Sequence, residues 1–165
     1  MGLSPTLDVE VAALGDALRA RGWMIATAES CTGGLIAAAC TAVAGSSDWF
    51  ERGIVSYSNP AKIELLGVPA TLIDEHGAVS AEVARAMAEG AIAHSMADLT
   101  VAVTGIAGPG GATPGKPVGT VWLALARRGE PAQAELLRLR GDRAAVREQT
   151  VRHALARLRQ WSERA

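Results

Sequence analysis

Apolar residues recur at helical spacing in three long stretches of this chain, and this pattern predicts three amphipathic helices. The first helix begins with Ser4 as its N-cap and Pro5 at its first position, and it ends at Gly22. The second runs from residue 81 to about 96, and the third begins at residues 141–142. The positions predicted to face inward are Leu7, Val11, Leu14 and Leu18, then Val83, Met87 and Ala91, and finally Val146, Thr150, Ala154, Leu158 and Trp161.

Short apolar runs between these helices predict five strands, and two further runs predict shorter helices. The predicted strands are 23–27, 53–58, 99–104, 120–126 and 134–140, the short helices are 35–44 and 60–66, and residues 72–77 form a connecting loop. The last two strands are joined through a turn at 128–131, so we expect them to be antiparallel. This order indicates the α/β class, as a three-layer α/β/α sandwich with a mixed, mostly parallel sheet.

Composition and charge narrow the class of protein. With 165 residues the chain is long enough for a real core, and we expect a single domain over residues 1–165. The formal net charge of −1 gives no electrostatic reason to expect nucleic acid or a membrane as partner. No signal peptide or membrane-spanning stretch is visible, and Cys31 and Cys40 lie too far apart on one helix to be bridged. We therefore expect free thiols and a cytoplasmic location.

The stretch 28–34 (AESCTGG) carries the first candidate chemistry. Ser30 falls where a predicted strand is followed by a predicted helix, and Gly33 and Gly34 leave the backbone there uncovered. Such a turn exposes a hydroxyl and the first free N–H groups of a helix. It suits a nucleophile with an oxyanion site, and equally a phosphate-binding loop. A helix N-terminus capped by Ser30 or Thr32 is the structural alternative.

Two further predicted strand ends carry polar or glycine-rich sequence. Tyr57 lies at the end of the second strand, and residues 105–111 (GIAGPGG) follow the third. In open α/β sheets, ligands collect beyond the C-terminal ends of the strands. Our hypothesis is that these loops converge on one pocket with Ser30, although the order of the strands is not readable from the sequence.

Lysine usage adds a second candidate group. Of 16 basic residues, only Lys62 and Lys116 are lysines. Unlike arginine, a buried lysine can lose its proton and act as a base. Neutral Lys62 could take the proton of Ser30 directly or through the hydroxyl of Tyr57. At an ordinary pKa of about 10.4, roughly one lysine in two thousand is neutral at pH 7, so this mechanism needs a lowered pKa. A surface lysine without a role is the alternative.

Other motifs are rejected on their context. Residues 110–116 match the spacing of a Walker A loop, but Pro117 stands where the magnesium-binding hydroxyl belongs and a strand follows. We expect no metal site, because the histidines lack partners at ligand spacing; they are His76, His94 and His153. Cys31 remains a minor alternative to Ser30 as nucleophile.

Together these motifs resemble the CinA C-terminal domain family, the nicotinamide-nucleotide amidases (PncC), in its stand-alone form. The resemblance covers roughly residues 7–158. It rests on five motifs in order, which are 28–34 (AESCTGG), 55–59 (VSYSN) with Lys62, 77–80 (GAVS), 104–111 (TGIAGPGG) and 116–120 (KPVGT). The chain departs from the family pattern at Ala112, where a third glycine is usual, and at Gly115, where a polar or acidic residue is common.

The resemblance implies hydrolysis of the carboxamide of nicotinamide mononucleotide to nicotinate mononucleotide and ammonia, without metal or cofactor. It implies Ser30 as the nucleophile, with Tyr57 and Lys62 as its activating pair. The expected oxyanion and substrate-binding positions are Thr32, Gly33, Gly34, Thr104, Gly105, Ala107, Gly108, Gly110 and Arg143. Within this set, the 105–111 loop would cradle the nucleotide, and Arg143 is a candidate phosphate ligand with a structural ion pair as its alternative.

The expected partner is a small-molecule nucleotide, and the family resemblance implies a homo-oligomer. A catalytically silent nucleotide-binding or interaction module, linked to competence or the DNA-damage response, is the alternative function. An amidase for another pyridine or nucleotide amide is a third possibility. The presence of Ser30, Tyr57 and Lys62 together favours an enzyme, because a binding module needs no such trio.

Overall fold

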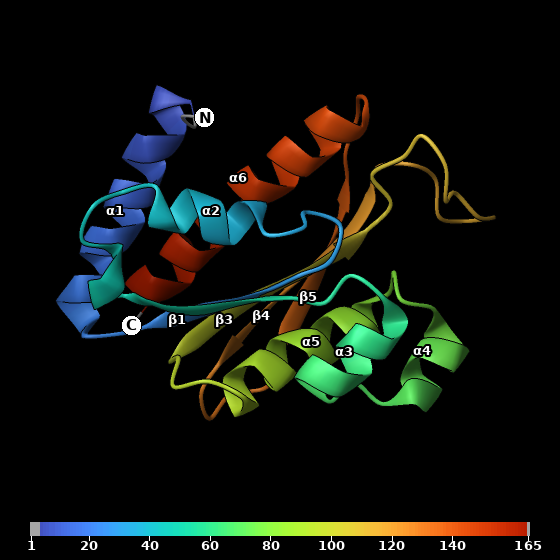
Figure 1. Cartoon of the computed structure of the whole chain (residues 1–165), viewed down its shortest axis with the longest axis horizontal. Coiled ribbons are helices and arrows are strands. Elements are labelled where there is room, and N and C mark those ends of the chain that lie inside the picture. Colours follow the sequence, from blue (N-terminus) through green and yellow to red (C-terminus); the bar gives the residue numbers. More distant parts are fainter. Residues whose placement is uncertain (1–3, 165) are drawn as a thin grey trace.

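The structure, a computed structural model, describes residues 4–164. Five strands within this range form one sheet in the order β2-β1-β3-β4-β5 (Figure 1). The strands are β1 (Ile25–Glu29), β2 (Phe50–Val55), β3 (Leu99–Gly105), β4 (Thr120–Arg127) and β5 (Gln133–Arg138). β1 pairs in parallel with β2 and β3, whereas β4 is antiparallel to both β3 and β5. The predicted mixed sheet is therefore confirmed, with its parallel strands side by side.

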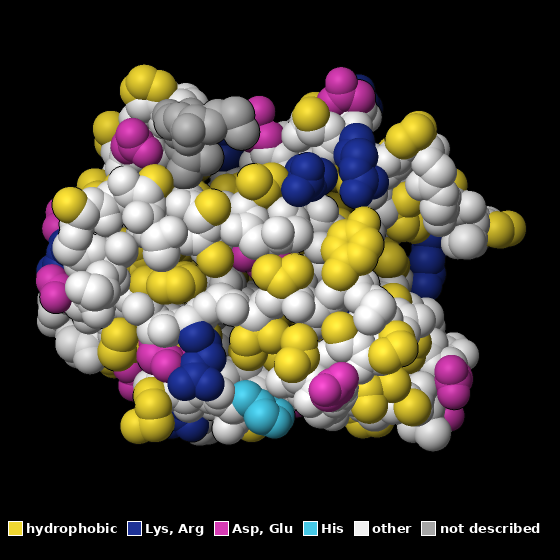
Figure 2. Space-filling view, in the orientation of Figure 1, with side chains coloured by type: hydrophobic (Ala, Val, Ile, Leu, Met, Phe, Trp, Pro, Cys, Tyr) yellow, Lys and Arg dark blue, Asp and Glu magenta, His cyan; other side chains and the backbone are white. Residues whose placement is uncertain are grey.

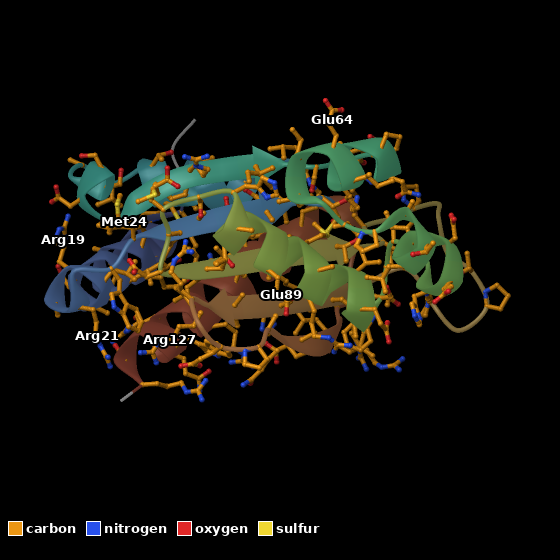
Figure 3. The ribbon with its side chains drawn as sticks, turned by 90° about the horizontal axis from the view of Figure 1, so that it is seen from below. Arg19, Arg21, Met24, Glu64, Glu89 and Arg127 are labelled. Carbon is orange, nitrogen blue, oxygen red and sulfur yellow. The ribbon has the colours of Figure 1, made fainter. Side chains whose placement is uncertain are left out.

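Helices cover both faces of the sheet and give the three predicted layers (Figure 1). One face carries α1 (Pro5–Arg21), α2 (Leu35–Thr41) and α6 (Arg143–Glu163), and the other carries α3 (Asn59–Leu66), α4 (Ala70–His76) and α5 (Ala81–Ala93). A short 3-10 helix, η1 (Ser46–Asp48), precedes β2. Figure 3 shows the second face from below, with Glu89 on α5 and Glu64 on α3. None of the helices within residues 4–164 has the length and apolar character needed to span a bilayer.

The apolar stripes behave as predicted, because every predicted inward position of α1, α5 and α6 is buried. The stripes of α1 and α6 pack in one core cluster, and that of α5 packs in a second. Burying one large apolar side chain contributes about 1.5–3 kcal/mol, so these stripes hold the layers together. The helix ends follow the predicted signals: Gly22 is left-handed, and the side chain of Asp142 accepts the N–H of Ala145 at 2.9 Å.

Several predicted boundaries were wrong. Residues 72–77 are not a loop, since 70–76 form α4, which follows Pro69 and has no side-chain cap to mark its start. β1 is displaced by two residues from the predicted 23–27. β2 ends at Val55, so Tyr57 lies in the loop that follows it and not in the strand.

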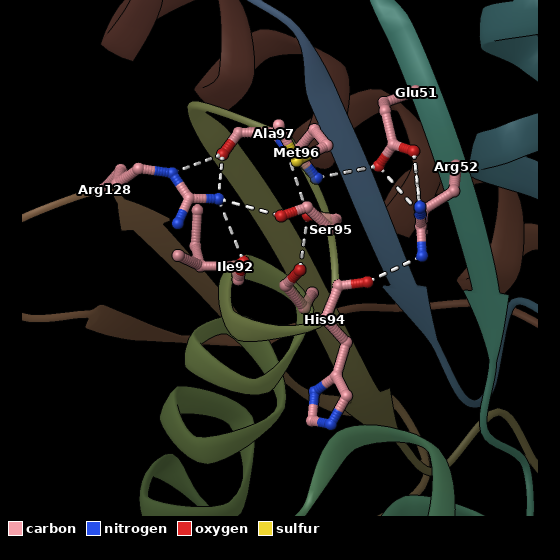
Figure 4. Close-up of polar contacts among 9 residues, drawn as sticks. Glu51, Arg52, Ile92, His94, Ser95, Met96, Ala97 and Arg128 are labelled. Carbon is pink, nitrogen blue, oxygen red and sulfur yellow. Dashed lines mark hydrogen bonds and ion pairs between the residues drawn. The ribbon is translucent and has the colours of Figure 1, made fainter.

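The C-terminal end of α5 also differs from its prediction, and side chains of neighbouring elements explain why (Figure 4). The guanidinium of Arg128 donates hydrogen bonds to the carbonyls of Ile92, Ser95 and Ala97. Arg52, on β2, donates to the carbonyl of His94 at 2.7 Å. These bonds satisfy carbonyls that a helix end otherwise leaves without donors, so α5 stops at residue 93 and not at the predicted 96.

The path of the chain places one edge of the sheet for ligand binding. From β1 the chain reaches β2 through α2 on one face, and it returns past β1 to β3 through α3, α4 and α5 on the opposite face. Where one connection leads to the neighbour on one side of a strand and the next connection leads to the neighbour on its other side, over the opposite face, the strand order reverses at a switch point. Ligands bind in the crevice outside the carboxyl ends of the strands at such a point. β1 lies at that point.

Candidate functional site

The carboxyl ends of β1, β2 and β3 meet, as hypothesised. The N–H of Ser30 donates to the carbonyl of Val103 in β3 at 3.1 Å. The N–H of Ser56, directly after β2, donates to the carbonyl of Glu29 at 2.8 Å. The loops after all three parallel strands therefore share one edge of the sheet with Ser30 between them.

Lys62 reaches Ser30 from the second turn of α3, a helix capped by Ser58. Its side chain is buried, with 1% of the residue exposed, and its Nζ lies 3.0 Å from Oγ of Ser30. Nζ also donates to the carbonyls of Ser56 at 2.9 Å and Tyr57 at 3.1 Å. Within residues 4–164, no carboxylate forms an ion pair with this amine.

Burial lowers the pKa of Lys62 below its ordinary value, because desolvation disfavours the charged amine, while the neighbouring Cys31 acts in the opposite direction. Oγ of Ser30 and the carbonyl oxygens of Ser56 and Tyr57 can form hydrogen bonds with Nζ of Lys62 whether the amine is charged or neutral. A charged amine donates to all three, and a neutral amine donates to the carbonyls of Ser56 and Tyr57 and accepts the O–H of Ser30. A proton can therefore move between Ser30 and Lys62 without rearrangement of the site.

The Ser30 turn is held on both sides by residues that the sequence analysis did not single out. The buried carboxylate of Glu29 accepts the Thr32 hydroxyl at 2.6 Å and the N–H groups of Ile36 and Ala37 at 2.8 and 3.0 Å. Arg147, on α6, donates to the carbonyls of Cys31 and Thr32, both at 3.1 Å. A lone carboxylate in an apolar strand was a signal for Glu29, whereas Arg147 is one of many arginines on its helix.

Gly33 and Gly34 have φ values of 60° and 104°, in the left-handed region that favours glycine, which fits their predicted role in uncovering the turn. The N–H of Gly33, expected to face an oxyanion, instead donates to the carbonyl of Ser30 at 3.0 Å. In the described part of the chain, no protein acceptor receives the N–H of Thr32 or Gly34. These two groups are the better candidates for an oxyanion.

Tyr57 contacts the serine–lysine pair through its main chain and not through its hydroxyl. Its main-chain carbonyl accepts from Lys62, but its hydroxyl accepts a hydrogen bond from Arg143 at 3.3 Å. The residue is 60% exposed. The direct contact of Ser30 with Lys62 thus leaves the hydroxyl of Tyr57 outside the proton path in this geometry.

The predicted residues of the loop after β3 divide between structural and open positions. The hydroxyl of Thr104 is buried and donates to the carbonyl of Ala78 at 2.9 Å, so it anchors the loop before α5. Gly105 is the last residue of β3, and the carbonyl of Gly108 accepts from Arg143 at 2.9 Å. Ala107 is buried, whereas Gly110 is exposed at the outer part of the loop.

A hollow of about 640 Å³ adjoins this loop and the start of α6. Its lining residues are Ala107, Pro109, Val118, Gly141, Asp142, Arg143, Ala144 and Arg147. Because Arg147 also holds the carbonyls of Cys31 and Thr32, the hollow borders the Ser30 turn. Figure 2 shows basic side chains over the N-terminal part of α6, next to hydrophobic surface. The site thus combines an apolar wall with two guanidinium groups.

Two remaining candidates have other environments. Burial raises the pKa of the Cys31 thiol to about 11, which leaves it protonated and weakly nucleophilic at neutral pH. Lys116 donates to the carbonyl of His76 at 2.9 Å, so it ties its loop to the end of α4. The geometry therefore favours Ser30 over Cys31 as nucleophile.

Fold and site define an α/β domain with a buried serine–lysine pair at the carboxyl edge of its parallel strands. A family model for the CinA C-terminal domain matches residues 8–162, and the chain belongs to this family. It is 50% identical over 145 residues to "Nicotinamide-nucleotide amidohydrolase PncC" from Enterobacter agglomerans, covering 88% of this chain and 87% of the relative. The crystal structure of the competence/damage inducible protein CihA from Agrobacterium tumefaciens matches with a TM-score of 0.91 and 45% identity, over 96% of this chain and 97% of that one.

Other relatives are longer proteins. A CinA-like protein from Citrifermentans bemidjiense is 58% identical over 144 residues, which cover 87% of this chain and 34% of the relative. The chain thus spans about a third of the length of that relative.

Proposed function

We propose that this protein is a serine amidase that hydrolyses the carboxamide of nicotinamide mononucleotide to nicotinate mononucleotide and ammonia. The observation that carries the proposal is the buried amine of Lys62, 3.0 Å from Oγ of Ser30. The named activity of the 50% identical relative from Enterobacter agglomerans supports the substrate.

In the first half of the reaction, neutral Lys62 takes the proton of Ser30 as Oγ attacks the carboxamide carbon. The carbonyl oxygen becomes an oxyanion, for which the N–H groups of Thr32 and Gly34 are candidate donors. Lys62 then gives its proton to the leaving nitrogen, the C–N bond breaks, and ammonia departs. The product is an ester between Ser30 and the nicotinate group.

In the second half, water replaces ammonia. Lys62, neutral again, takes a proton from the water as its oxygen attacks the ester carbon. When the C–O bond to Ser30 breaks, Lys62 returns the proton to Oγ. Nicotinate mononucleotide leaves, and the serine–lysine pair regains its starting state.

The nucleotide part of the substrate would occupy the hollow beside the 105–111 loop. Arg143 and Arg147 stand one helical turn apart at the start of α6, where the helix dipole also favours an anion. A guanidinium group pairs well with phosphate oxygens. We assign the phosphate to this end of the hollow, with the apolar wall formed by Ala107, Pro109 and Val118 along the ribose.

The experiment that tests the proposal is ammonia release from nicotinamide mononucleotide by the wild type and by Ser30→Ala, with a chelator present. Release by the wild type alone supports the proposal. Binding of the nucleotide without release by either protein would replace it with a silent nucleotide-binding module. Release of ammonia from other pyridine amides but not from the mononucleotide would mean that the protein is a serine amidase with a different substrate.

A further inference from the structure

The single tyrosine of this chain presents an exposed aromatic ring beside the proposed nucleophile. Its main-chain carbonyl lies 3.1 Å from Nζ of Lys62 and 3.5 Å from Oγ of Ser30. At the far end of the side chain, its hydroxyl accepts from Arg143, which lines the hollow. The ring of Tyr57 therefore spans the distance between the serine–lysine pair and the proposed phosphate end.

Charged groups of both signs lie near the ring of Tyr57. Arg143 and Arg147 line the hollow, and Lys62, which is neutral when it acts as the base, lies behind the nucleophile. Of the nearby carboxylates, Asp142 accepts the N–H of Ala145, and Glu29 is buried with three donors of its own. A positively charged substrate ring that lies over Tyr57 is close to Arg143, which donates to the tyrosine hydroxyl. The face of an aromatic ring is the part of such a site that attracts a cation.

We propose that Tyr57 is a specificity-determining residue, whose ring face binds the positively charged pyridinium ring of the substrate. This inference rests on the proposed function. The carboxamide would lie at Ser30 and the phosphate at Arg143, with the pyridinium over the tyrosine ring between them. The hydrogen bond from Arg143 holds the hydroxyl and so fixes the orientation of the ring. Tyr57 thereby favours oxidised nicotinamide nucleotides, which carry this charge, over reduced ones, which do not.

The test compares the binding of two probes that differ in ring charge. Nicotinamide mononucleotide and its reduced 1,4-dihydro form are titrated calorimetrically into Ser30→Ala protein, which cannot turn them over by the proposed route. The same titrations are made after Tyr57→Phe, which keeps the ring, and Tyr57→Leu, which keeps an apolar side chain without one. Met96→Leu, at a residue that is 77% exposed beyond the end of α5, is the remote control.

We expect the oxidised form to bind more tightly than the reduced form when residue 57 is tyrosine or phenylalanine. With leucine, the ratio of the two dissociation constants should fall about two- to fivefold, as expected for one cation–π contact. A ratio of dissociation constants that is unchanged by Tyr57→Leu would overturn the inference, because the loss of a merely structural side chain weakens the binding of both probes equally. Equal binding of the two probes to the Tyr57 protein would also overturn it. Neither result bears on ammonia release by the wild type. If the wild type released no ammonia from nicotinamide mononucleotide, the proposed function itself would be wrong.

Discussion

Replacing Lys62 with methionine removes the proposed base and keeps the apolar stem of the side chain. Methionine is unbranched and flexible, so it can fill the space that the lysine stem occupies within α3 and beneath the Ser30 turn. The change leaves the carbonyls of Ser56 and Tyr57 without the donor that they share in the wild type. We expect the fold to persist and turnover to be lost.

The contacts of Lys62 determine how much the substitution should change the free energy of unfolding and the rate of turnover. A buried carbonyl left without a donor, as that of Ser56 would be, costs about 1–3 kcal/mol, whereas the carbonyl of Tyr57 keeps the Ser30 hydroxyl as a donor at 3.5 Å. The change also removes the cost of burying an amine whose pKa is lowered by desolvation. These two contributions oppose each other, so we expect the free energy of unfolding to change by at most about 2 kcal/mol. Loss of a general base lowers turnover by about 10²–10⁴-fold.

The assay is steady-state ammonia release from nicotinamide mononucleotide, with urea unfolding measured on the same preparations. Lys62→Arg is the matched control, because it keeps the charge but cannot lose its proton. We expect both variants to be inactive. Turnover by folded Lys62→Met within tenfold of the wild type would refute the assignment of Lys62 as the base.

Lys62, Glu29 and Arg128 each make contacts whose effect can be measured. The activity of the wild type should rise with pH up to the lowered pKa of Lys62, because only the neutral amine is a base. Between that pKa and the ordinary value of 10.5, Lys62 is protonated in the unfolded chain but neutral in the folded protein. Over this range the free energy of unfolding of the wild type, relative to that of Lys62→Met, should therefore rise with pH. A flat difference between the two unfolding curves from pH 7 to 10 would contradict this. Glu29→Gln replaces a carboxylate that accepts three hydrogen bonds with an amide that has a single acceptor atom, and should lower the unfolding free energy by about 1–3 kcal/mol and reduce turnover; unchanged urea midpoint and rate would argue against this role. Arg128→Met removes the donor at the end of α5, at the opposite edge of the sheet, and should destabilise by about 1–2 kcal/mol while leaving the KM for the nucleotide unchanged.

The helices with regular apolar stripes could be predicted from the sequence because their periodicity and their caps agree. α4 could not, since it is only seven residues long and begins after Pro69 without a side-chain cap. The end of α5 was misplaced because Arg128, some 30 residues further on, supplies the donors that stop it. Local patterns do not contain contacts of this kind.

The site shows the same division. Ser30 and Lys62 could be proposed from a strand–helix turn and from sparing lysine usage, and the structure brings their reactive atoms within 3.0 Å. The direction of the Tyr57 side chain could not be predicted, because it depends on a loop and on Arg143 in a distant helix. The support of the Ser30 turn by Arg147 likewise joins residues that are more than a hundred positions apart.

The central claim is that Ser30 carries the acyl group during turnover. The most direct test is to quench the wild-type reaction with acid during steady-state hydrolysis of nicotinamide mononucleotide and to locate any adduct by peptide mass spectrometry. Our account predicts a nicotinate mononucleotide ester on Ser30, and neither adduct nor ammonia from Ser30→Ala. A thioester on Cys31, or ammonia release by Ser30→Ala at the wild-type rate, would contradict it.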